Sequence, residues 1–387
     1  MVYNIFVLFS LLMLYLYYYS DYEKESCRKA IFFGMWLLFS IEFYTTKDYE
    51  VYYENFSRVH MHVIWEPLYR LLLSIFQPFG FYVFNSCVAA FEFFTLYTIF
   101  KRAVPKEYFW LAILMLILNT ESLFYFMCIK RQFFAICMSL WTLYFILYTT
   151  NKLRYLWAVI TFLCAVNLHA SAYAAIGYFL LPLIRFRLNL VFAIIVGLLY
   201  VGSVSFQISS YSDMLYEMVS MVEDDDMGNN RYALYVDYQD KGQAEKIVSG
   251  IFVQSFQIIL FILLLIYNKR VSVTQYKLFL LSIIALIFGN FLIGDFFRLN
   301  LYYSITFLFT TPILLSYIHR DMSSIFMFCL YWGFMALALL SPVKSYYNAM
   351  SGTKVSYMTV KMKHFYTIFD ENPDKSSYSF EGERRIK

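Results

Sequence analysis

The chain has 387 residues, of which 61% are hydrophobic and only 15% charged, and its formal net charge is +4. Soluble domains average about 45–50% apolar and about 25% charged residues, so this composition excludes an ordinary soluble enzyme. The apolar residues fall into runs close to the about 20 residues that cross a bilayer as a helix. They therefore predict an all-α, polytopic transmembrane helical bundle.

Taken in chain order, the apolar runs predict about 11–12 spans in a single transmembrane domain over residues 1–341. The first run, Met1–Tyr19, lacks the basic start and the small-residue cleavage site of a signal peptide, so we expect it to remain as the first span. Residues 342–387 predict a polar C-terminal tail. The runs cover residues 2–19, 30–44, 80–100, 108–126, 132–149, 155–168, 171–184, 188–208, 248–267, 276–294, 297–318 and 323–341.

The short basic loops predict the orientation of these spans. Loops rich in Lys and Arg stay on the cytoplasmic side of a membrane, and here such loops alternate with acidic, mixed or very short ones. The alternation predicts an external N-terminus, whereas the side of the basic tail stays open. The basic loops are "YEKESCRKA", "KRAVPKE", "NKLR", "RFR" and "NKRVSVTQYK". The segments at the opposite face are 45–79, 119–131, 169–171, 209–247 and 295–297.

Two of these outer segments, 45–79 and 209–247, are long. The first contains "EPLYRLLLSIFQPFG", an apolar stretch too short to cross, which predicts a re-entrant or interfacial helix beside a cavity. The second contains "EDDD" at 223–226, which we interpret as a solvated acidic run because consecutive carboxylates point apart. The six cysteines show no zinc-site or redox-site spacing, so we expect small buried side chains and no metal site.

Charged side chains gather at the predicted outer face. Arg131 is the strongest candidate there, because an outer cation opposes the positive-inside bias and its planar guanidinium matches phosphate oxygens. Lys130 is equally well explained as a snorkelling residue at the membrane interface. Arg298 is a second cation that suits a diphosphate, or else it pairs with Asp295. The outer set is Asp48, Glu66, Lys130, Arg131, His169, Asp295 and Arg298.

His169 lies in "NLHASAY", where two apolar runs meet with almost no loop. Its imidazole either hydrogen-bonds the backbone or exchanges a proton at the mouth of the outer cavity, with Ser171 two residues further on. No GxSxG turn is present, so the pair is not a hydrolase triad. Asp48 and Glu66 are alternative general bases. Tyrosines of the first outer segment are suited to packing on sugar rings, and the candidates are Tyr49, Tyr52 and Tyr69.

The chain carries "DYEVYY", "WEPLYRLL", "IKRQFFA", "NLHASA" and "DFFRLNLYY" in this order. In order and spacing these stretches resemble the EpsG/Wzy-type family of polysaccharide polymerases, which are multispanning proteins of the bacterial inner membrane. The resemblance covers residues 1 to about 318. The stretch "EFYTTKDY" departs from the family pattern, since Glu42 and Phe43 stand in place of Arg-Tyr and Thr46 in place of Gly. This departure weakens a phosphate-binding role for that segment.

The resemblance implies a fold related to the GT-C glycosyltransferases and substrates that are sugars on undecaprenyl diphosphate. It implies transfer of a growing glycan to a new lipid-linked repeat unit, without nucleotide sugar, essential metal or other cofactor. From the residues and the resemblance together, we expect the catalytic residues to be Arg131, His169, Arg298, Asp48 and Glu66. The expected substrate-binding residues are Gln132, Tyr49, Tyr52, Tyr69, Ser171, Tyr302 and Lys130.

We therefore expect a polymerase of capsule, O-antigen or exopolysaccharide repeats at the outer face of the membrane. Its expected partners are membrane lipid and a chain-length regulator or flippase, with no nucleic acid. Two alternatives stay open: a flippase for the same lipid-linked glycan, and a membrane acyltransferase in which His169 is catalytic. A transporter predicts matched repeats with discontinuous helices, and an acyltransferase places its acyl donor on the cytoplasmic side.

Overall fold

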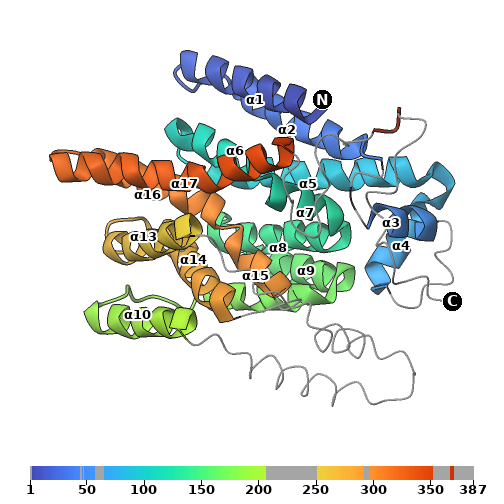
Figure 1. Ribbon diagram of the computed structural model, residues 1–387. Helices are drawn as coiled ribbons and strands as arrows, with labels where there is room; N and C mark the ends of the chain where they lie inside the picture. The colour runs from blue at the N-terminus through green and yellow to red at the C-terminus, as the bar shows by residue number, and fades with distance from the viewer. Residues whose placement is uncertain are drawn as a thin grey trace. The chain divides into compact units, whose positions relative to one another are not determined.

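The computed structural model describes residues 2–43, 46, 48–56, 65–205, 251–291, 297–351 and 367–369. This part of the chain contains 15 α-helices and no strand, which confirms the prediction of an all-α polytopic protein (Figure 1). One isolated antiparallel bridge joins Glu42 to Thr367. The predicted outer loop 209–247 lies outside the described residues.

The chain forms two compact units, one of residues 1–184 and 308–387 and the other of residues 185–307. The first unit contains α1 Val2–Tyr19, α2 Glu25–Ser40, α3 Tyr49–Phe56, α4 Pro67–Phe76, η2 Gln77–Phe79, α5 Phe81–Ala103, η3 Lys106–Tyr108, α6 Phe109–Ile117, α7 Thr120–Cys128, α8 Lys130–Tyr148, α9 Arg154–Leu168, η4 Ala170–Leu180, α16 Phe307–Arg320 and α17 Ile325–Ser351. The second contains α10 Leu190–Ser205, α13 Ile251–Tyr267, α14 Val273–Phe291 and α15 Phe297–Ser304.

Five helices of the described chain are long and apolar enough to cross a membrane. A sixth crossing is formed if α6 and α7, which meet at an angle of 62°, count as one broken span. This number is smaller than the number of apolar runs, because several runs fold into shorter elements. The runs at 155–168 and 171–184, for example, become the 15-residue α9 and the 11-residue 3-10 helix η4. At 1.5 and 2.0 Å per residue, each is about 22 Å long. The long helices are Val2–Tyr19, Phe81–Ala103, Lys130–Tyr148, Arg298–Arg320 and Ile325–Met350.

The short apolar stretch of the first outer segment is a helix, as the sequence predicts. Pro67 opens α4 at the first helical position, where its missing N–H costs nothing. The chain then turns through η2 to Gly80, whose φ of +86° is readily adopted only by glycine. Helix α5 starts directly after this turn, at Phe81. With 10 residues, α4 is too short to cross a bilayer.

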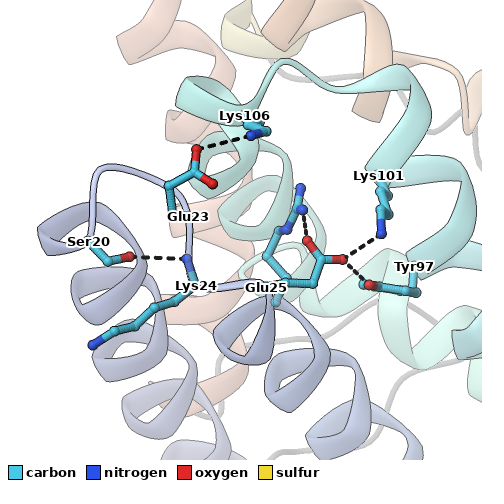
Figure 2. Close-up of polar contacts among 8 residues, drawn as sticks. Ser20, Glu23, Lys24, Glu25, Tyr97, Lys101 and Lys106 are labelled. Atoms are coloured by element: carbon cyan, nitrogen blue, oxygen red, sulfur yellow. Dashed lines mark hydrogen bonds and ion pairs between the residues drawn. The ribbon is translucent and has the colours of Figure 1, made fainter.

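One end of the first unit carries the basic loops. There the Glu25 carboxylate accepts hydrogen bonds from Arg28, Tyr97 and Lys101, as Figure 2 shows. Two loops that are far apart in the sequence, 20–28 and 101–108, therefore meet. This agrees with their predicted position on the same side of the membrane.

The opposite end of the first unit carries the predicted site residues. Helix α5 is 23 residues and about 34 Å long, enough to span a bilayer, and it has Lys101 near one end and Asn85 near the other. Asn85 accepts a hydrogen bond from Lys130 at the start of α8. Helix α9 packs along α8 and returns to this end at His169.

Helix α17 also returns to the site end. Helix α16 finishes among the basic loops, where the Tyr108 hydroxyl lies 2.6 Å from His319 Nδ1. Helix α17 then runs through Pro342 to Ser351, so that the first residues of the predicted tail are helical. Its last turns are held by hydrogen bonds between Ser345 and Thr120 and between Tyr346 and Asn4.

Candidate functional site

The site is built around the first turn of α8. Helix α7 ends at Cys128, and Ile129, with ψ of 46°, breaks the chain before α8 starts at Lys130. Successive residues of a helix are about 100° apart around its axis, as 3.6 residues per turn require. Lys130 and Arg131 therefore point to different neighbours. Lys130 contacts α5 and the residues after α2, whereas Arg131 contacts α4 and the residue before it.

Arg131 is held by an ion pair and by aromatic rings. Its Nη1 lies 2.6 Å from Glu66 Oε2, and the side chains are only 18% and 15% exposed. The guanidinium lies 5.2 Å from the Trp65 ring and 5.6 Å from the Tyr69 ring, which is within cation–π range. It also hydrogen-bonds the Tyr52 hydroxyl. Burial raises the pKa of Tyr52 to about 12, with Arg131 acting in the opposite direction, so the phenol is neutral at physiological pH.

Glu66 connects three elements. It is the residue that precedes Pro67 in α4, one carboxylate oxygen binds Arg131 on α8, and the other accepts the Ala170 N–H over 3.1 Å. Ala170 is the first residue of η4 and the neighbour of His169. The Glu66 carboxylate therefore fixes the Arg131 guanidinium and the His169 backbone relative to each other.

His169 stands at the break between α9 and η4, in an extended conformation with φ of −159° and ψ of 126°. Its Nδ1 lies 3.2 Å from the Ser171 backbone nitrogen and 2.7 Å from Ser171 Oγ. A backbone N–H can only donate, so Nδ1 is an acceptor and the proton of the neutral imidazole is on Nε2. The side chain thereby caps η4 and keeps a basic lone pair directed at Ser171.

Lys130 is bound inside the protein. Its ammonium donates to Glu42 Oε2 and to Asn85 Oδ1, both at 2.8 Å, and lies 5.2 Å from the Tyr49 ring. Glu42 is fully buried and also accepts from Thr46 at 3.0 Å. Glu42 and Thr46 are two of the positions that depart from the family pattern. Here they form part of the anionic pocket for Lys130.

The other candidates of the first unit surround these pairs. Asp48 directly precedes α3, where its backbone carbonyl accepts the Tyr52 N–H, and it hydrogen-bonds the Cys128 thiol. Tyr49 and Gln132 are buried, at 0% and 1% exposure. The structure thus brings Asp48, Tyr49, Tyr52, Glu66, Tyr69, Lys130, Arg131, Gln132, His169 and Ser171 to one end of this unit.

Arg298 and Tyr302 belong to the second unit, where both lie on α15. Tyr302 is fully buried and Arg298 partly exposed. Asp295, the suggested partner of Arg298, lies outside the described residues. The convergence of Arg131 and Arg298 on one diphosphate stays a prediction.

Sequence reasoning missed three residues of this region, Asn85, Glu92 and Arg70. Glu92 is 3% exposed in the middle of α5, and its Oε1 has no hydrogen-bond partner among the described residues. A carboxylate inside an apolar run is a recognisable sign of a functional residue, but Glu92 lies away from the helix ends where the other candidates were found. Asn85 gave no such signal, because a single amide near a helix start is common.

No group of three or more His, Cys, Asp or Glu side chains with the arrangement of a metal site occurs among the described residues. The polar groups that the described part of the site offers are a guanidinium, an imidazole, a serine hydroxyl and carboxylates. Groups of these kinds can stabilise negative charge and move protons.

A protein-family model, that of the EpsG family, matches residues 26–353. The chain belongs to the EpsG family. This confirms the resemblance noted in the sequence, and the matched segment contains every candidate residue named above. As an EpsG family member with several membrane-spanning helices, the chain has the character of a membrane-embedded polysaccharide polymerase. No curated protein and no solved structure matches the chain.

Proposed function

We propose that this EpsG family protein joins undecaprenyl-diphosphate-linked oligosaccharide repeats into a surface polysaccharide, at the outer face of the bacterial cytoplasmic membrane. The observation that carries the proposal is the Glu66 bridge. It holds an arginine and the segment of a histidine together at the end of the bundle opposite the basic loops.

The reaction needs a leaving group and a nucleophile. The anomeric carbon of one lipid-linked glycan forms a bond with a hydroxyl oxygen of the other substrate, and its bond to the diphosphate oxygen breaks. The hydroxyl proton passes to a base, and the polyprenyl diphosphate leaves with the electron pair. No nucleotide sugar is consumed, because the diphosphate already activates the donor.

Arg131 is suited to the leaving group. Negative charge grows on the diphosphate as the bond breaks, and a guanidinium in a water-poor site stabilises it strongly. Arg131 is largely buried, and its Nε–H has no partner among the described residues. Its ion pair with Glu66 fixes the guanidinium before the substrate binds, so no reorganisation is needed.

His169 is the preferred base. Its basic Nδ1 faces Ser171, so the acceptor hydroxyl either replaces the Ser171 hydroxyl or transfers its proton through it. Both carboxylate oxygens of Glu66 already accept hydrogen bonds, and Asp48 is hydrogen-bonded to the Cys128 thiol. Proton uptake by either carboxylate costs an existing hydrogen bond, as it does at His169 Nδ1, which accepts the Ser171 N–H. His169 is preferred because an imidazole exchanges protons near physiological pH, whereas a carboxylate ordinarily does so at lower pH.

Analysis of the lipid-linked repeats in a deletion strain tests the proposal against its two rivals. Loss of the polymerase leaves single repeats on the cell surface. Accumulation of repeats on the cytoplasmic side would instead indicate a flippase. Glycans of normal length that lack an acyl group would indicate an acyltransferase. Either of the last two results contradicts the proposal.

A further inference from the structure

Among the described residues at the site end, Arg70 is a cation without a counter-charge. It lies on α4, and no carboxylate of the described chain is within ion-pair distance of it. Its Nε is buried and has no hydrogen-bond partner among the described residues, while the side chain as a whole is partly exposed. By contrast, Lys130 and Arg131 each hold a carboxylate at 2.8 and 2.6 Å.

Arg70 is placed close to the Glu66 bridge. The Arg70 N–H donates to the Glu66 carbonyl over 3.1 Å, the first hydrogen bond of α4. Arg70 therefore lies one helical turn along α4 from Glu66, whose carboxylate meets Arg131 and Ala170. The neighbouring residues Tyr69 and Leu73 turn into the core, at 2% and 1% exposure.

The charges of the two known pairs cancel. Glu42 neutralises Lys130, and Glu66 neutralises Arg131. Arg70 therefore adds a positive charge that the neighbouring ion pairs do not compensate. A partly buried guanidinium with an unpartnered N–H lowers stability unless an anion binds to it. A guanidinium fork is the side chain best matched to phosphate oxygens.

We propose that Arg70 binds the diphosphate of the lipid-linked substrate and works together with Arg131. This inference rests on the proposed function for the identity of the ligand, a diphosphate ester of a polyprenyl chain. Arg131 is preset by Glu66, whereas Arg70, which has no anionic partner among the described residues, gains one when the substrate arrives. Arg70 thus determines how tightly the diphosphate group binds.

Binding of undecaprenyl diphosphate to the purified full-length protein tests the inference. The variant is Arg70→Gln, and the matched control is Arg102→Gln, an exposed arginine in the last turn of α5 at the basic end. Loss of a charge-assisted hydrogen bond predicts a Kd about 10- to 100-fold weaker for Arg70→Gln. The control keeps the Kd of the unsubstituted protein. Arg70→Lys, which keeps the charge but loses the fork, falls between them.

Phosphatidylglycerol vesicles and undecaprenyl monophosphate separate a diphosphate site from general attraction to anionic lipid. Arg70→Gln must weaken diphosphate binding more than binding of either of these probes. An equal loss for all three overturns the inference. So does an unfolded Arg70→Gln variant, because the arginine would then have a structural partner.

Failure of the inference and failure of the proposed function are distinguishable. If the unsubstituted protein forms polymer and Arg70→Gln has an unchanged Kd for the diphosphate, the inference is wrong and the function stands. If Arg70→Gln loses diphosphate binding but the unsubstituted protein forms no polymer, the site stands and the function is wrong.

Discussion

Arg131 donates to Glu66 over 2.6 Å, although the two residues are 65 positions apart in the chain. The same carboxylate binds the backbone beside His169, 104 positions away. Helix ends from α4, α8 and η4 are thus fixed to one another by one side chain. This explains how a predominantly apolar protein holds a polar site at one end of its bundle.

The ion pair itself gives the first prediction. Arg131→Met abolishes long glycan, and Arg131→Lys also loses most activity because an ammonium lacks the planar fork. The double variant Arg131→Met, Glu66→Met removes both charges and regains thermal stability relative to either single variant. Glycan length and melting temperature in detergent are measured together. Long glycan restored by the double variant would show that Arg131 serves only to hold Glu66.

Lys130 and Glu42 give a prediction about stability. Removal of one member leaves the other charge buried, which costs about 3–5 kcal/mol. We expect Lys130→Met and Glu42→Met each to lower the melting temperature and the double variant to recover most of the loss. If Lys130 has only a structural role, this stable double variant still makes long glycan. A stable but inactive double variant would instead assign Lys130 to substrate binding.

Replacement of Glu92, unlike that of Lys130 or Glu42, is not expected to lower the stability of the protein. One of its oxygens has no partner among the described residues, and the side chain is buried in α5. Leucine has a similar size and no polar group to desolvate. Glu92→Leu is therefore neutral or raises the free energy of unfolding by about 1–4 kcal/mol. Thermal unfolding in detergent measures this change in stability. The control is Asn85→Leu, which is expected to destabilise the protein because Asn85 hydrogen-bonds Lys130 and the Phe39 carbonyl. A marked loss of stability in Glu92→Leu would mean that the carboxyl has an essential partner.

The position of the C-terminal segment gives a topology prediction. Ile368 donates to the Ile41 carbonyl over 3.0 Å, next to Glu42. Residues 367–369 therefore lie at the site end, opposite Lys106. In a chain whose six native cysteines are replaced, Phe369→Cys reacts with a membrane-impermeant maleimide in intact cells. Lys106→Cys reacts only after permeabilisation. The reverse pattern would place the site on the cytoplasmic side.

Much of the helical framework was predictable from the sequence. Apolar runs at 2–19, 80–100 and 132–149 correspond closely to α1, α5 and α8, because a bilayer-length run leaves the backbone few alternatives to a helix. The predicted limits of the second helix, residues 30–44, were less accurate. It starts at Glu25, where a polar first turn hides the beginning of the helix, and ends at Ser40.

The site was only partly predictable. Polar residues at helix ends stand out in an apolar sequence, so Arg131, Glu66 and His169 were identifiable one by one. Their partners were not, because a contact such as Lys130 with Glu42 joins positions 88 residues apart. The sequence showed Glu42 only as a departure from the family pattern and did not reveal that it pairs with the buried Lys130. Arg70 gave no signal in the sequence, because only the structure shows that its Nε has no partner among the described residues.

The most direct test is polymer formation by the purified protein from a lipid-linked repeat unit, with His169→Asn and His169→Ala compared. Asparagine retains an acceptor for capping η4, whereas alanine loses the cap and about 1 kcal/mol of stability. We expect a ladder of glycan lengths for the unsubstituted protein and single repeats for both variants. A ladder from His169→Asn as long as that of the unsubstituted protein would contradict it, since the imidazole would then only cap a helix.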